Sequence, residues 1–116
     1  MKKLILALAL CVTVLTSCKV SPTGDGKKDA DFFAKKMASC YKKKDVVKMR
    51  VTINYFYNYY KKQPASKVKK FVDSIEEEVK YGDLKNVDSE KFEAMLQAAD
   101  NHNRMDKLFE KAKRAK

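Results

Sequence analysis

The stretch Val51-Thr52-Ile53-Asn54-Tyr55-Phe56-Tyr57-Asn58-Tyr59-Tyr60 decides whether the fold is all-helical or contains a sheet. Residues 51–55 alternate, and their β-branched and aromatic side chains favour a strand. A helical period fits as well, because apolar side chains recur at intervals of four, three and four residues, at Met49, Ile53, Phe56 and Tyr60. The sequence offers no second segment suited to pair with a strand, and a solitary strand would leave its backbone hydrogen bonds unmade. The sequence therefore predicts a helix over residues 46–62.

The segment before this stretch has a clear 3.6-residue period that begins at Lys27. Lysines and aspartates fill its polar face, and its apolar face consists of Ala30, Phe33, Ala34, Met37, Cys40 and Tyr41. The period stops at Lys42-Lys43-Lys44, and Asp45 is suited to cap the helix that follows. Because Cys40 lies on the apolar face, the pattern favours a small buried side chain over a disulfide with another chain.

Two further helices are predicted after Gln63-Pro64, a pair that ends one helix and begins the next. The third helix is expected to end at Gly82. Its apolar face consists of Val68, Phe71, Val72, Ile75 and Val79. The fourth helix begins at Asp88 and changes phase in its second half, so a kink or break is expected near Asn101-His102-Asn103. We therefore predict an all-α fold, a small antiparallel bundle of three to four helices over residues 27–116.

Residues 1–17 have the pattern of a secretory signal peptide. Lys2 and Lys3 provide a positive start, and the next dozen residues are apolar apart from Thr13. That stretch is shorter than the roughly 20 apolar residues of a transmembrane helix, which favours a cleaved signal over a spanning anchor. Residues 18–26 contain serine, proline, threonine and glycine and are expected to form a flexible tether before the domain.

The end of the signal, Leu15-Thr16-Ser17-Cys18, resembles the lipobox of bacterial lipoproteins. The resemblance implies cleavage before Cys18, lipid on its thiol, and attachment to a membrane through two or three acyl chains. The alternative is an ordinary secretory signal with a chance cysteine. Lys19 stands where an aspartate would favour the inner membrane, so the resemblance implies the outer membrane of a bacterial envelope. In this signal and in the approach to the first helix (residues 24–30), the chain resembles small lysine-rich helical lipoproteins of gut Gram-negative bacteria, a group without an assigned function.

Positive charge is concentrated in the first predicted helix and the loop after it. Residues 27–50 carry nine Lys or Arg against three Asp, in a chain whose formal net charge is +11. The lysines expected to contact a ligand are Lys35, Lys36, Lys42, Lys43 and Lys44. Outside the cytoplasm such a surface favours anionic lipid or acidic glycan as a partner, and not nucleic acid. The alternative is a solvated helix face without a ligand.

Two tyrosines form a second candidate contact. If residues 46–62 are helical, Tyr55 and Tyr59 lie one turn apart on a face that differs from the core face. Exposed tyrosines stack on sugars or anchor protein partners. The alternative is a partly buried boundary of the core, covered by the last helix.

Residues suited to catalysis or metal binding are sparse. His102 is the only histidine, and its spacing to Asp100 and Asp106 is not specific to a metal site. Three successive glutamates at Glu76-Glu77-Glu78 point in different directions around a helix. We expect no catalytic residue, no metal and no cofactor, and we hypothesise a non-enzymatic, lipid-anchored binding module of the envelope. The alternative hypothesis is an inhibitor or immunity-type lipoprotein that blocks a secreted enzyme or toxin.

Overall fold

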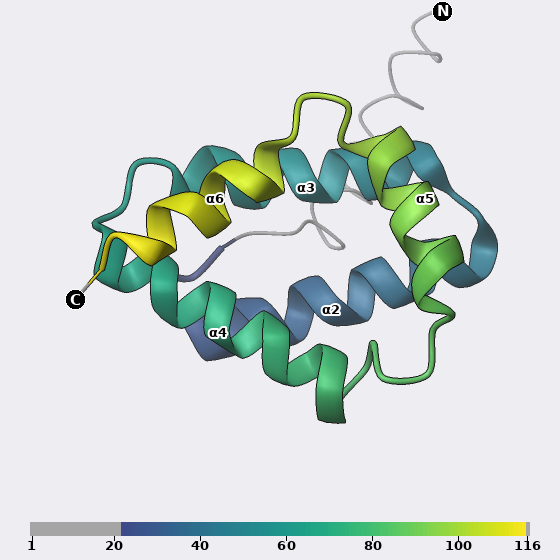
Figure 1. Cartoon of the computed structure of the whole chain (residues 1–116), viewed down its shortest axis with the longest axis horizontal. Coiled ribbons are helices and arrows are strands. Elements are labelled where there is room, and N and C mark those ends of the chain that lie inside the picture. The colour runs from purple at the N-terminus through teal and green to yellow at the C-terminus, as the bar shows by residue number, and fades with distance from the viewer. Residues whose placement is uncertain (1–21, 116) are drawn as a thin grey trace, which may run out of the picture.

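The computed structural model describes residues 22–115, and in that range the chain forms five α-helices and no strand. The helices are α2 (Gly26–Lys43), α3 (Val46–Tyr60), α4 (Ala65–Tyr81), α5 (Ser89–Ala99) and α6 (Arg104–Lys113). The all-α prediction is therefore confirmed (Figure 1). The predicted signal peptide and Cys18 lie outside the described residues. No helix within residues 22–115 is both long enough and apolar enough to cross a bilayer.

The stretch that decided the fold class is helical throughout, as the apolar spacing predicted. Its four periodic residues, Met49, Ile53, Phe56 and Tyr60, are all buried in α3. The rings of Phe56 and Tyr60 stack on Phe71 of α4, with centroids 5.5 Å and 4.2 Å away. Helical spacing prevails over strand propensity because it places all four side chains against a neighbouring helix, where burial of apolar area stabilises them.

The helices alternate in direction along the chain, apart from α5. In Figure 1, α2 and α4 run away from the end where the chain enters the bundle, while α3 and α6 run back towards it. Helix α4 packs between α2 and α6, and α3 packs against α2, α5 and α6. Short α5 lies across the far end, where its described packing partner is α3. Alternating directions follow from the short connections between helices.

The predicted apolar faces of α2 and α4 are buried with two exceptions. Tyr41 is half-buried at the end of α2, and Val79 is 51 % exposed near the end of α4. The prediction was wrong for Val79 because the last turn of α4 extends to the open edge of an apolar cavity. Cys40 is buried, as its place on the apolar face predicted. Its burial raises the pKa of the Cys40 thiol.

The break expected in the last predicted helix is present, and it raises the number of helices to five. Helix α5 ends at Ala99, and Asn103 adopts a left-handed conformation with φ of 53° before α6 begins. The buried carboxylate of Asp100 accepts hydrogen bonds from the backbone N–H groups of Arg104 at 2.8 Å and Met105 at 2.9 Å. Asp100 therefore satisfies two of the free N–H groups at the start of α6.

The predicted flexible tether over residues 18–26 needs a correction at its described end. Helix α2 begins at Gly26, and Asp29 in its first turn is buried. The Asp29 carboxylate accepts hydrogen bonds from the backbone N–H and hydroxyl of Thr23 and from the backbone N–H of Gly24. The hydroxyl of Tyr60 also donates to it. Residues 23–26 are thus fixed to the domain, because a buried carboxylate requires these donors.

Candidate interaction surfaces

The lysines predicted to form one basic surface on α2 divide into separate groups in the structure. Lys35 pairs with Asp31 on the same helix, with 3.1 Å between Nζ and Oδ2. This hydrogen bond and the charge of Asp31 raise the pKa of Lys35. Lys36 lies over the ring of Phe32, 5.9 Å from its centroid. These two lysines have partners of their own, which leaves the lysines at the end of α2 as the free part of the predicted surface.

The end of α2 lines a recess together with the starts of α3 and α5. Six residues line this basic recess: Tyr41, Lys42, Lys44, Val46, Lys91 and Met95. Three of these residues are lysines, and none of the described residues that line the recess is acidic. Lys44 reaches the recess because it ends α2 in a left-handed conformation, with φ of 56°.

The third lysine of the recess comes from a distant segment. Lys91 stands in the first turn of α5, which packs against α3. The sequence does not mark Lys91 as part of this site, because neither charge density nor helical period indicates where α5 lies. The tilted contact between the rings of Tyr41 and Phe92, with centroids 5.8 Å apart, helps to position α5 beside α2. Lys43, the remaining predicted lysine, is exposed on α2 but does not line the recess.

The predicted pair of exposed tyrosines is not present. Tyr55 is 48 % exposed, but Tyr59 is half-buried against the core. The ring of Tyr59 contacts that of Tyr60, with centroids 4.9 Å apart. Its hydroxyl lies beside Gly24, where an added Cβ would come within 2.9 Å. Because residues before α2 cover Tyr59, Tyr55 alone of this pair offers an open aromatic surface.

Three carboxylates gather where the end of α4 approaches α2. Asp31, Glu78 and Asp83 each place an oxygen within 4.8 Å of the other two. Two of these carboxylates already accept hydrogen bonds, Asp31 from Lys35 and Glu78 from the backbone N–H of Asp83 at 3.0 Å. The hydrogen bond between Asp83 and Glu78 closes the turn at Gly82 in which α4 ends. The cluster is therefore accounted for by local hydrogen bonding.

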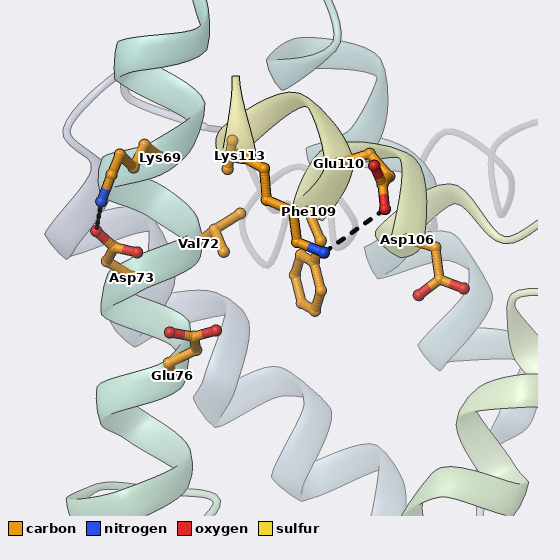
Figure 2. Close-up of a pocket in the computed structure, with 9 residues that line it drawn as sticks. Lys69, Val72, Asp73, Glu76, Asp106, Phe109, Glu110 and Lys113 are labelled. Carbon is orange, nitrogen blue, oxygen red and sulfur yellow. Dashed lines mark hydrogen bonds and ion pairs between the residues drawn. The ribbon is translucent and has the colours of Figure 1, made fainter. Parts of the chain in front are cut away.

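Helices α4 and α6 enclose a charged groove (Figure 2). Figure 2 shows the apolar side chains of Val72 and Phe109 between the two helices, with charged groups on both sides. Each lysine pairs with an acid of its own helix. The Nζ–oxygen distances are 2.7 Å for Lys69 and Asp73 and 3.7 Å for Lys113 and Glu110. Such exposed pairs within one helix contribute little to holding the two helices together.

A more enclosed cavity of about 400 Å³ lies between α2, α4, α5 and α6. Its wall is largely apolar and includes Phe33, Met37, Ile75, Leu84, Leu96 and Met105. The charged residues that line it are Lys85, Glu93 and Asp106. Their opposite signs favour neither an anionic nor a cationic head group on a bound molecule.

The residues weighed as possible catalytic or metal-binding groups have structural roles or stand in solvent. The carboxylate of Asp100 accepts hydrogen bonds from the first backbone N–H groups of α6. His102 is exposed in the link between α5 and α6. No family model, curated protein or solved structure matches this chain. The function must therefore be inferred from the chain itself.

Proposed function

We propose that this protein is a lipid-anchored component of a bacterial cell envelope whose domain binds an anionic ligand without catalysing a reaction. The anchor is the lipid on Cys18, and the outer membrane is the proposed location. The observation that carries the binding function is the basic recess, where Lys42, Lys44 and Lys91 come from two helices and one helix end.

The chemistry of the recess favours a phosphorylated or carboxylated sugar. Three lysines line the site together with Tyr41 and Met95, and none of its described lining residues carries a carboxylate. A tyrosine ring offers a face for a sugar, and lysines bind phosphate or carboxylate groups as point charges. All three lysines are exposed, so salt should screen their attraction and weaken binding.

The test is calorimetric titration of the mature protein in detergent with the phosphorylated carbohydrate that remains after lipopolysaccharide is deacylated. We expect saturable binding that weakens as salt is added. The triple substitution K42E/K44E/K91E should weaken binding about tenfold or more, because it reverses the charge around the recess. A matched control, K80E/K85E/K107E, changes the net charge equally at exposed positions outside the recess.

Equal weakening by the two triple variants would show that net charge alone drives binding and would contradict a site at the recess. Capture of one stoichiometric protein partner from envelope extract, with no carbohydrate binding, would also contradict the proposal. That second outcome would instead favour an inhibitor or immunity-type lipoprotein.

A further inference from the structure

Cationic side chains gather at the end of the bundle where the chain enters it. This tether end consists of the start of α2, the end of α3, the start of α4 and the end of α6, and it lies beside the C-terminus in Figure 1. Nine exposed cationic residues belong to these four segments. Lys69 and Lys113 pair with acids of their own helices. The other seven are Lys27, Lys28, Lys61, Lys62, Lys67, Lys70 and Arg114. We infer that the tether end is a membrane-facing surface that rests on the anionic phosphate groups of the bilayer that holds Cys18.

Direct contacts hold these four segments at one place. Lys67 and Lys70 of α4 line a hollow together with Gly24, Asp25 and Gly26. Gly26 sits so close to α4 that an added Cβ would lie 2.8 Å from the backbone nitrogen of Phe71. The start of α2 and the start of α4 therefore form one surface.

The other two segments are joined by a hydrogen bond. Lys111 of α6 donates from Nζ to the backbone carbonyl of Lys61, at 2.7 Å, just after α3 ends. This bond places Arg114, one turn further along, at the same end as Lys61 and Lys62. The three residues between Lys61 and the start of α4 complete the connection to Lys67 and Lys70.

Two carboxylates at the tether end, those of Asp25 and Asp29, offset part of this positive charge. The carboxylate of Asp25 accepts hydrogen bonds from the backbone N–H groups of Lys27 and Lys28 and caps α2. The carboxylate of Asp29 is buried beneath Thr23 and Gly24. The seven cationic side chains outnumber these two carboxylates, so the surface keeps a net positive charge, and a plane of lipid phosphates provides the matching charge.

The short length of chain between Cys18 and the domain brings the tether end close to the bilayer. Pro22 comes four residues after Cys18, and four steps of extended chain span at most about 14 Å. The chain after Pro22 is fixed to the domain by the hydrogen bonds of Thr23 and Gly24 to Asp29. A lipid on Cys18 would hold the tether end within reach of the head groups. The inference rests on the proposed lipid anchor and adds to it a defined orientation.

The orientation has a consequence for the basic recess. Helix α2 starts at the tether end and finishes at the recess, and its 18 residues span about 27 Å. With the tether end on the membrane, the recess points away from the lipid and towards soluble ligands.

The test is lysine labelling of the mature protein reconstituted in vesicles, with labelling rates measured by mass spectrometry. Vesicles of phosphatidylcholine with phosphatidylglycerol are compared with vesicles of phosphatidylcholine alone. We expect Lys61, Lys62, Lys67 and Lys70 to label about fivefold more slowly on the anionic vesicles. Labelling of Lys42 and Lys91 in the recess should be the same on both. The variant K61E/K62E/K67E/K70E should lose the protection of Lys27 and Lys28, while the control K48E/K80E/K85E/K107E should retain it.

Equal labelling of the tether-end lysines on both kinds of vesicle would overturn the inference while leaving the anchor intact, provided that the protein sediments with the vesicles. Protection of the recess lysines instead would overturn it as well, since it would reverse the orientation. Failure of the protein to sediment with either vesicle would contradict the proposed anchor itself, and with it the orientation. Circular dichroism of both quadruple variants verifies that the helices remain folded.

Discussion

Asp29 joins the segment that leads to the proposed anchor with the core of the bundle. Its carboxylate is buried and receives hydrogen bonds from Thr23 and Gly24 on one side and from Tyr60 on the other. Burial of a carboxylate is costly unless donors surround it, and here each donor comes from a residue whose position Asp29 fixes in return. This single residue therefore converts the last part of the tether into part of the domain.

Replacement of Asp29 should destabilise the fold strongly. Asp29→Ala leaves the buried hydroxyl of Tyr60 and the N–H of Gly24 without their acceptor, so we expect the free energy of unfolding to fall by about 3 kcal/mol. Urea denaturation followed by circular dichroism measures this loss. Asp73→Ala removes an aspartate whose ion pair is exposed and should leave the urea midpoint nearly unchanged. Similar midpoints for the two variants would contradict the role of Asp29.

Tyr60 should make the fold sensitive to alkali. Burial and the hydrogen bond to Asp29 raise the pKa of Tyr60 above the value of about 10 that it has in the unfolded chain. The contribution of the protonated Tyr60 hydroxyl to the free energy of unfolding is fully present below about pH 10. Above that pH the unfolded chain loses this proton and the folded chain keeps it, so stability falls by about 1.4 kcal/mol per pH unit.

A comparison of the unmodified protein with Tyr60→Phe separates the loss of stability that Tyr60 causes at high pH from the loss that the lysines cause. The variant should be less stable at neutral pH, because Asp29 loses a donor, but its stability should fall less steeply above about pH 10. Tyr55→Phe, at an exposed position, should keep the steeper dependence of the unmodified protein. Urea denaturation across this pH range gives both slopes. Parallel slopes for the unmodified protein and Tyr60→Phe would contradict the prediction.

Among the helices, α5 is the element with the weakest attachment. Ala99 is its only buried residue, and its described packing partner is α3. Arg50 of α3 holds the end of α5, donating from Nε to the carbonyl of Ala99 at 3.0 Å and from Nη2 to that of Ala98 at 3.1 Å. Because α5 carries Lys91, its attachment also determines the shape of the basic recess.

We expect the amides of α5 to exchange with deuterium faster than those of the other four described helices, since few buried contacts oppose its opening. Arg50→Met removes two hydrogen bonds to α5 and should accelerate this exchange about tenfold, with little change in α2 or α4. Hydrogen exchange followed by mass spectrometry measures both effects. Acceleration spread evenly over all helices would indicate global destabilisation and would contradict the local role of Arg50.

The elements also show how far the sequence could predict this structure. The helix over residues 46–60, the start of α4 after Pro64 and the break near Asn103 follow from local spacing and capping, and local patterns predict them. The exposure of Val79 and the cover over Tyr59 depend on where distant segments lie, which no local pattern specifies.

The residues of the candidate site also divide into those that a local sequence pattern indicates and those that only tertiary packing brings together. Lys42 and Lys44 could be identified from a run of charge, whereas Lys91 joins them only through tertiary packing. The tether-end lysines are scattered over four segments, so no charge run in the sequence marks them. Asp29 lies one turn before Phe33 and so borders the apolar face, but an aspartate is normally expected to be exposed, and only the fold reveals its donors.

The two ends of the bundle carry different cationic surfaces. The tether end has cationic side chains from four segments beside the point where the chain enters the domain. The far end has the basic recess, formed by α2, α3 and α5. We propose that the first end meets the membrane and the second meets a soluble anion, so that one anchored domain presents its recess away from the bilayer.

This arrangement depends on the lipid at Cys18, and mass spectrometry of the intact protein from isolated membranes tests it most directly. We predict a mature protein that begins at Cys18, carries the added mass of two or three acyl chains, and fractionates with the outer membrane. An unmodified Cys18, or a chain cleaved at another position and released in soluble form, would contradict it.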